Sequence, residues 1–555
     1  MKNFAIALVL GITVAVTSCG QKSTKKVINF VQSNGITTPI HRANIGTVQF
    51  LSALLPLEEI KTSDFLDHHE LNDESNLSIR IFMENSITNY LHELDTTLTA
   101  EELLQKGNYQ FSFYVDDQLL YTENLNTGAG LPQQKNEFTT LAIPLLSTKN
   151  EDSWGRFLWM RFYYRHGGED ALATGKHRLK IEVRPYLQQE QLVVGNVIAK
   201  GEIDLQWSEP EVPEEEVAIQ SIAPNSGWEL STAPYDTEKI RALNTKIAQN
   251  RFKEIASIVV IKNEKLLVEA YFNGANRNTL HDTRSVGKSF ASTVTGIALA
   301  EGHLKNTDQT LNAFYDLKQY ANYSPKKEQV TLKSLLTMSS GFTGNDDNYS
   351  SPGNEERMYP TEDWVKFTLD LPMDDAKEVG ETWEYFTAGV VVLGDVLHKT
   401  VPGGLEKYAD QKLFHPLGIS DYKWQYTPQH VANTAGGLQM RALDFAKYGQ
   451  LYKNGGTWKG KQILPSDWVD QTLMNYFEKT PDQTAYGLLF WGKEYQVNGQ
   501  SYPAFQCSGN GGNKVIIFDD LPLVIVITAT AYGQPYGHSQ VDKMMERYIL
   551  PALLN

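Results

Sequence analysis

The chain has 555 residues, which is too long for one hydrophobic core and predicts two or three domains. Hydrophobic residues make up 41% of it and aromatic residues 11%, values that exclude general disorder. The net charge of −16, without a basic cluster, argues against nucleic-acid binding. The 12 histidines form no H-x-x-x-H pair and there is no C-x-x-C, so we expect neither a metal nor an organic cofactor.

Residues 1–19 have the features of an export signal. Lys2 supplies a positive charge, and Phe4–Val16 is apolar but too short for a permanent membrane span. The stretch ends in Val16-Thr17-Ser18-Cys19-Gly20, which resembles a bacterial lipoprotein signal. The resemblance implies that Cys19 is lipidated and anchors the protein in the bacterial cell envelope, on the periplasmic or outer-membrane face. In the alternative, an ordinary secretory signal, Cys19 is incidental.

After a polar tether at residues 20–28, the pattern over 29–207 is mostly β. Aromatic-rich runs such as Phe157–Tyr164 are predicted as strands, and turn signals separate them. We therefore expect an all-β, sandwich-like accessory domain at 29–207. Most of its aromatic side chains are expected in the core, although Trp154 and Trp159 leave open a contact with glycan or cell-wall polymer.

An acidic, proline-bearing segment, 208–234, is predicted as a linker to a second domain at 235–555. Strand signals lie at both ends of this second domain, with helical segments between them. The strand signals are Ile258–Ile261, Leu266–Phe272, Lys514–Phe518 and Leu523–Ile527. The pattern predicts a multidomain protein whose second domain is α+β, with an antiparallel sheet built from both ends and a helical cluster inserted.

The run Ser285-Val286-Gly287-Lys288 places a serine and a lysine three residues apart. On a helix the two side chains share one face, one turn from each other. A partly desolvated lysine there can lose its proton and accept that of the serine hydroxyl. The helix start also favours developing negative charge. S-x-x-K is the nucleophile motif of β-lactamases and penicillin-binding proteins, but two fixed letters also match by chance.

Five further segments follow this motif in order. They are Thr331–Gly341, Trp383–Gly394, Asn433–Gly449, Gly460–Val469 and Phe505–Asn513. With them, residues 235 to 553 resemble the serine β-lactamase-related family, which includes class C β-lactamases, D-stereospecific peptidases, family VIII carboxylesterases and aminohexanoate-oligomer hydrolases. The resemblance implies the β-lactamase/transpeptidase-like fold and hydrolysis of a small ester or amide through an acyl-enzyme.

The resemblance also implies roles for four residues. Ser285 matches the acylated nucleophile, and Lys288 matches the lysine that activates it. Tyr385 matches the tyrosine of a Y-x-N motif, which shares proton transfer and protonates the leaving group. A nearby protonated lysine is expected to favour the phenolate of this tyrosine. The backbone N–H groups of Ser285 and Asn510 match the oxyanion hole. Outside this context, Tyr385 would be interpreted as a buried aromatic side chain.

Two departures argue against a true β-lactamase or a D-alanyl-D-alanine peptidase. Thr387 stands where Y-x-N carries an asparagine that holds the side-chain amide of β-lactams. Cys507-Ser508-Gly509 stands where lactamases carry K-T-G and many relatives H-x-G, so the cation that attracts a substrate carboxylate is missing. Thr387, Cys507, Ser508 and Gly509 are expected to contact substrate. Cys507 is expected there as a small uncharged lining residue, with a reactive thiol as the alternative.

The sequence therefore predicts an envelope-anchored serine hydrolase of the esterase or amidase type. Three alternatives stay open: an amidase or peptidase for D-amino-acid or cell-wall peptides, a true β-lactamase, and a binding protein that keeps this fold without turnover.

Overall fold

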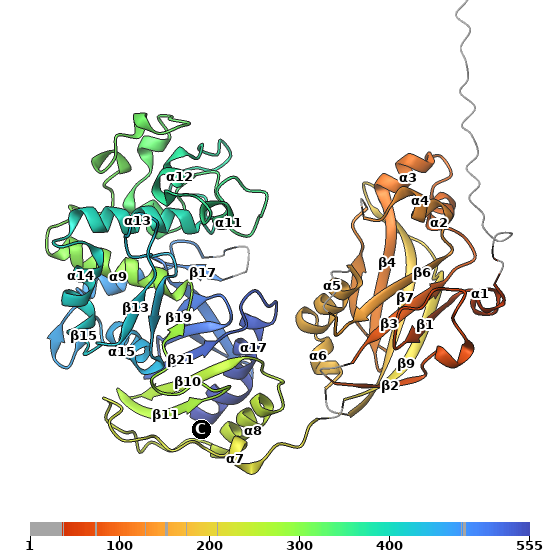
Figure 1. The fold of residues 1–555 in the computed structure, drawn as a ribbon, viewed down its shortest axis with the longest axis horizontal. Coiled ribbons are helices and arrows are strands. Elements are labelled where there is room, and N and C mark those ends of the chain that lie inside the picture. Colours follow the sequence, from red (N-terminus) through yellow and green to blue (C-terminus); the bar gives the residue numbers. More distant parts are fainter. Residues whose placement is uncertain are drawn as a thin grey trace, which may run out of the picture. The chain divides into compact units, whose positions relative to one another are not determined.

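The computed structural model describes residues 36, 38–72, 75–127, 129–149, 154–173, 175–207, 209–478, 480 and 484–554. The predicted signal, Cys19 and the tether at 20–28 lie outside these residues. The chain divides into two compact units, Met1–Glu209 and Pro210–Asn555 (Figure 1). Within the described residues, no helix has both the length and the apolar character needed to cross a membrane.

The N-terminal unit contains one mixed β-sheet instead of the two packed sheets of a sandwich. Its described strands run in the order β5-β4-β7-β9-β1-β3-β6, with β2 added to β9 and β8 added to β7. Strand β9 pairs in parallel with β1 and β2, and the other pairs are antiparallel. The strands are β1 (Thr47–Leu51), β2 (His68–Leu71), β3 (Leu77–Phe82), β4 (Gly107–Val115), β5 (Gln118–Asn124), β6 (Thr140–Leu146), β7 (Gly175–Gln188), β8 (Leu192–Val194) and β9 (Ala199–Trp207).

The N-terminal unit is also not all-β. Phe157–Tyr164, predicted as a strand, is helical: it lies in α5 (Trp154–Met160) and the π-helical turn Arg161–Arg165. Its buried side chains recur with helical spacing and not at every second position, at Leu158, Trp159, Phe162 and Tyr163. The other helices of this unit are α1 (Pro39–Asn44), α2 (Ile87–Leu94), α3 (Ala100–Lys106), α4 (Pro132–Glu137) and α6 (Gly168–Ala171).

The two tryptophans considered for glycan contact lie in different environments. Trp159 is 2% exposed and packs against Phe162 and Tyr163 in the core of the unit. A glycan therefore cannot contact Trp159 without unfolding this region. Trp154 is 39% exposed and remains available to a ligand.

Much of the predicted linker packs on the C-terminal unit. Helix α7 (Glu214–Val217) lies against α8 (Thr237–Ala248). The Asn244 side chain donates hydrogen bonds to the carbonyl oxygens of Val217 and Ala218, at 3.2 and 3.1 Å. Leu230 forms a parallel bridge with Leu266. This segment is therefore packed against the C-terminal unit in spite of its acidic composition.

The C-terminal unit is α+β, as predicted. Its described strands form an antiparallel sheet in the order β11-β10-β21-β20-β19-β18-β17. Strands from the two ends of the unit meet where β10 pairs with β21. The strands are β10 (Ile255–Lys262), β11 (Lys265–Tyr271), β17 (Ala485–Tyr486), β18 (Trp491–Val497), β19 (Gln500–Gly509), β20 (Asn513–Phe518) and β21 (Leu523–Ala529).

Helices cover both faces of this sheet (Figure 1). On one face lie α9 (Val286–Ala300) and α15 (Ala442–Lys453), followed by the inserted helical cluster. On the other face lie α8 and α17 (Gly537–Met544), which continues into α18 (Leu550–Leu553). The cluster contains α10 (Leu332–Leu336), α11 (Glu355–Met358), α12 (Trp364–Asp370), α13 (Thr387–Thr400), α14 (Leu405–Ala409) and α16 (Ser466–Thr472). Shorter strands are β12 (His281–Asp282), β13 (Tyr422–Trp424), β14 (Leu438–Met440), β15 (Thr457–Trp458) and β16 (Lys461–Gln462).

Helix α9 occupies the centre of the unit. Nearly all its residues are buried, which explains its small and apolar composition. A Cβ at Gly296 would lie 2.3 Å from the Trp468 side chain, so α16 can pack closely only against a glycine. The central position fixes the start of α9, where Ser285 lies.

Candidate active site

Ser285 lies at a tight turn between β12 and α9. It is the N-cap residue of α9 and is half-buried. Arg284, just before it, has a φ of 53°, a left-handed conformation that residues other than glycine rarely adopt. The Arg284 guanidinium lies over the Tyr532 ring at 4.5 Å, and the Tyr532 hydroxyl donates to the Asp282 carbonyl at 2.6 Å. These contacts hold the serine at the helix start, where the dipole of α9 favours negative charge.

Lys288 contacts Ser285 directly. Its Nζ donates a hydrogen bond to Ser285 Oγ at 2.8 Å and another to the Ala435 carbonyl oxygen at 2.5 Å. The lysine is only 2% exposed. The S-x-x-K motif therefore has the geometry that the sequence predicts, with both side chains on one helical turn.

The segment around Ala435 supplies a contact that sequence reasoning did not anticipate. Asn433 Oδ1 accepts a hydrogen bond from the Ala435 N–H at 2.9 Å, which shapes the turn. A Cβ at Gly287 would lie 3.3 Å from Gly436 Cα, so the two backbones are in close contact there. The Gly436-Gly437 pair was the available sequence signal for a close approach of this kind.

Tyr385 lies beside both residues. Its ring centroid is 5.3 Å from Lys288 Nζ, and its hydroxyl hydrogen-bonds with Ser285. Burial raises the pKa of Tyr385, while the Lys288 charge and the Ser285 hydrogen bond act in the opposite direction without cancelling it. The Lys288 charge thus favours the phenolate, as expected, but burial outweighs it and the resting side chain is a phenol.

Two tryptophans extend the site beyond Tyr385. Trp491 stacks on Tyr385 with ring centroids 5.7 Å apart, and Trp383 lies 5.7 Å from Trp491. Both tryptophans are partly exposed. Tyr486 and Phe490, in contrast, are at most 1% exposed and belong to the core. Trp383 and Trp491 thus form an aromatic wall next to the phenol.

Asp346 is a carboxylate in the site that the sequence did not single out. Its Oδ2 accepts from the Thr387 N–H at 2.6 Å, and its Oδ1 accepts from the Glu355 N–H at 2.9 Å. Its own N–H donates to the Tyr385 carbonyl at 3.0 Å. Burial and the Glu355 charge raise the pKa of Asp346 to about 6, against the opposing charge of Lys288. Asp346 lies in the polar run 345–348, whose sequence is the same as that of an ordinary turn, so no pattern marked it as a site residue.

Two of the expected substrate-binding side chains are buried. Thr387, the first residue of α13, is 0% exposed. Cys507 is also 0% exposed and faces the core beneath α9, where burial raises the pKa of its thiol to about 12. The alternation of side chains along β19 points Cys507 inward and leaves Ser508 half-buried. Thr387 and Cys507 therefore pack beneath the surface of the site and do not line it.

The end of β19 approaches the serine turn through its backbone. A Cβ at Gly509 would lie 1.9 Å from the Thr283 carbonyl oxygen and 3.1 Å from the Ser285 nitrogen. Only glycine allows this approach. Asn510 follows at the exposed strand end, and its Oδ1 accepts from the Gly533 N–H at 2.9 Å. The 509–510 backbone therefore lies next to the Ser285 N–H, as an oxyanion hole made by Ser285 and Asn510 would require.

These groups suit acyl transfer. A hydroxyl, an amine and a phenol are in mutual contact, and backbone N–H groups lie beside the hydroxyl. In the described part of the chain, no group of three or more His, Cys, Asp or Glu side chains is placed to hold a metal ion.

Known proteins resemble the C-terminal unit. An uncharacterized protein of Alkalihalophilus pseudofirmus is 22% identical over 318 residues, covering 51% of this chain and 85% of its own. The structure of a family VIII carboxylesterase is 18% identical, covers 59% of this chain and 98% of its own, and has a TM-score of 0.43. A D-stereospecific amidohydrolase from Streptomyces sp. is 15% identical, covers 53% and 93%, and has a TM-score of 0.42.

A family model described as Beta-lactamase matches residues 245–545, which is more than half of the chain. The matched range contains the whole Ser285 site. The chain therefore belongs to the Beta-lactamase family of serine hydrolases.

Proposed function

We propose that this protein is an envelope-anchored hydrolase that cleaves a small ester or amide through an acyl-enzyme on Ser285. The observation that carries the proposal is the 2.8 Å contact between Lys288 Nζ and Ser285 Oγ, with the Tyr385 phenol at the same serine. A nucleophile in contact with both a base and an acid is the arrangement that acyl transfer requires.

In the first half-reaction, Ser285 Oγ attacks the substrate carbonyl carbon. The hydroxyl proton passes to Lys288 in its neutral form, which the Ala435 carbonyl keeps in place. The carbonyl oxygen becomes an oxyanion, and the N–H groups of Ser285 and Asn510 stabilise it. Removing one such donor typically costs about 10²- to 10³-fold in kcat.

Collapse of the intermediate breaks the bond to the alcohol or amine. Tyr385 donates its proton to the departing oxygen or nitrogen, a role that the raised pKa of Tyr385 suits because the side chain starts as a phenol. Lys288 returns a proton to Tyr385. Water then attacks the acyl-enzyme by the reverse sequence and releases the acid and free Ser285.

The walls of the site favour neutral, partly apolar substrates. Trp383 and Trp491 offer aromatic surface beside Tyr385. The strand position that carries a lysine in K-T-G is the buried, neutral Cys507. A substrate carboxylate thus lacks the cation that would hold it at this strand, which favours an ester or simple amide over a β-lactam.

The lipid anchor at Cys19 is part of this proposal and rests on the sequence alone. Growth with an alkyne fatty acid should label the wild-type protein and leave Cys19→Ser unlabelled and released from the membrane fraction. Labelling of Cys19→Ser would contradict the anchor without affecting the proposed chemistry.

Hydrolysis of a short-chain p-nitrophenyl ester and of a chromogenic cephalosporin should be compared for wild type and Ser285→Ala. We expect ester turnover that disappears in Ser285→Ala and little cephalosporin turnover. Cephalosporin turnover as fast as ester turnover would contradict the substrate class. Ester turnover that persists in a folded Ser285→Ala would contradict the nucleophile.

A further inference from the structure

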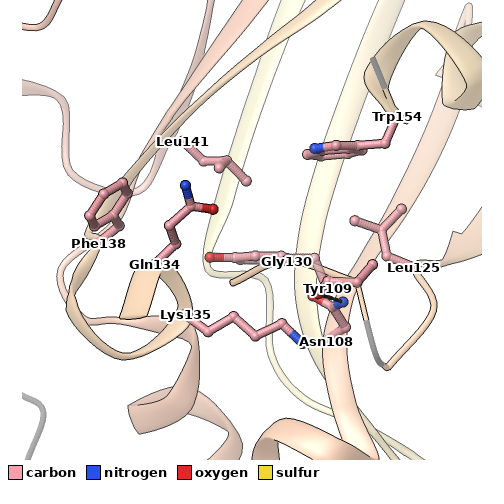
Figure 2. A pocket seen from close by; sticks show the side chains of 10 residues that line it. Asn108, Tyr109, Leu125, Gly130, Gln134, Lys135, Phe138, Leu141 and Trp154 are labelled. Atoms are coloured by element: carbon pink, nitrogen blue, oxygen red, sulfur yellow. Dashed lines mark hydrogen bonds between the residues drawn. The ribbon is translucent and has the colours of Figure 1, made fainter. Parts of the chain in front are cut away.

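The N-terminal unit has a cavity of about 90 Å³ that is unrelated to the Ser285 site. It lies where α4, α5, β4 and β6 meet. Figure 2 shows Trp154 on one side, Phe138 and Gln134 on the other, and Tyr109 between them. Apolar groups make up most of its lining, including Leu125 and Leu141.

Tyr109 presents an unused hydrogen-bonding group to this cavity. The side chain is 7% exposed, and in Figure 2 its hydroxyl points between Gln134 and the floor of the cavity. Among the described residues, no hydrogen bond to this hydroxyl is formed. Although most of the side chain is buried, its hydroxyl oxygen stays accessible from the cavity. A ligand oxygen would supply the missing partner.

Lys135 places a positive charge at the floor of the same cavity. It is 5% exposed, and its Nζ donates to the carbonyl oxygens of Thr127, Gly107 and Leu104 at 2.8, 3.4 and 3.5 Å. Within the part of the chain that is described, no carboxylate pairs with it. Burial alone lowers the pKa of Lys135 to about 8. A buried cation is normally paired with an anion.

We propose that this cavity binds a small apolar anion, a monocarboxylate with a short hydrocarbon body. The body fills the space beside Trp154, Phe138 and Leu141, and the carboxylate accepts a hydrogen bond from Tyr109 in the field of Lys135. Dry cavities of ~150 Å³ take up a benzene-sized molecule, so a cavity of about 90 Å³ suits a chain of a few carbons. A sugar ring carries too many hydroxyl groups for this apolar lining, which separates the proposal from glycan binding.

Titration calorimetry with butanoate, whose body has three carbons, and its neutral analogue butanamide tests this proposal. The full-length protein is used in detergent, with Ser285 blocked by a covalent phosphonate so that the catalytic site cannot bind the acid. We expect saturable butanoate binding and at least ~10-fold weaker butanamide binding, because a charge-assisted hydrogen bond is lost. Equal affinities, or no saturable butanoate binding, would overturn the proposal.

Three variants locate the site. Tyr109→Phe should weaken butanoate binding at least ~5-fold without loss of thermal stability, because no residue that the structure describes hydrogen-bonds with the hydroxyl. Trp154→Ala should weaken it further, whereas Phe157→Ala should not. Phe157 is the matched control, since it lies on the same helix, is 45% exposed and does not line the cavity. Unchanged affinity in both Tyr109→Phe and Trp154→Ala would contradict the assignment.

Discussion

The start of α9 and the end of β19 meet at Ser285, and they differ in what they contribute. The α9 side supplies side-chain chemistry, because Lys288 touches the serine and Tyr385 lies beside both. The β19 side supplies backbone only: Gly509 allows the close approach, and Cys507 points into the core. One side of the site thus supplies ionisable side chains next to the serine, and the other side supplies backbone alone.

The largest effect should follow from removing the amine on the α9 side. Lys288→Met should lower kcat/KM for a p-nitrophenyl ester at least ~10³-fold, because the base that accepts the serine proton is lost. Lys327→Met is the matched control. Lys327 is also buried, and its Nζ donates to the carbonyl oxygens of Ala321 and Leu369. Both variants should lose some stability, but equal losses of activity would contradict the role of Lys288.

Tyr385→Phe should lower kcat about 10²- to 10³-fold, because the proton donor for the leaving group is lost while the ring still stacks on Trp491. The loss should be smaller for p-nitrophenol, a good leaving group, than for a simple alkyl ester. Tyr486→Phe, in the same aromatic cluster but 1% exposed, should keep near wild-type activity. An equal loss for both leaving groups would contradict the general-acid role.

On the β19 side, restoring the lysine of K-T-G should damage the fold instead of creating a β-lactamase. Cys507→Lys should destabilise the protein by about 3–5 kcal/mol, the usual cost of an uncompensated buried charge, because position 507 is 0% exposed. Thermal melts of Cys507→Lys and the control Cys507→Ser measure this effect. Wild-type stability together with cephalosporin turnover in Cys507→Lys would show that side chain 507 can reach the substrate.

The smallest effect concerns pH. Below about pH 6, Asp346 gains a proton and holds the Thr387 and Glu355 N–H groups less strongly, so the support of Tyr385 weakens. We expect kcat/KM to fall several-fold as the pH drops through about 6. In Asp346→Asn, activity at pH 8 should be lower and this pH dependence should be lost. An unchanged acid limb in that variant would assign the titration to another group.

More of the C-terminal unit than of the N-terminal unit could be predicted from the sequence. In the C-terminal unit, short apolar runs predicted β10, β11, β20 and β21, and the family motifs predicted the order of the site segments. In the N-terminal unit, Phe157–Tyr164 was predicted as a strand because aromatic residues favour sheets. Its neighbours instead placed four of these side chains on one helical face. The helical structure of this segment thus depends on its tertiary packing, which the local sequence does not reveal.

Within the site, the sequence predicted the motif residues but not the residues that hold them in place. Ser285 and Lys288 lie three apart on one helix, so local geometry alone brings them together. Asp346 and Ala435 reach the same place through loops far along the chain, and no local pattern marks such contacts. The inward direction of Cys507 depends on the register of β19, which a motif match does not give.

The most direct test of the central claim is active-site labelling with a fluorophosphonate, followed by peptide mass spectrometry. We expect one modified peptide containing Ser285, no labelling of Ser285→Ala, and protection by an ester substrate in proportion to its occupancy of the site. A label on another serine, or equal labelling of Ser285→Ala, would contradict this claim.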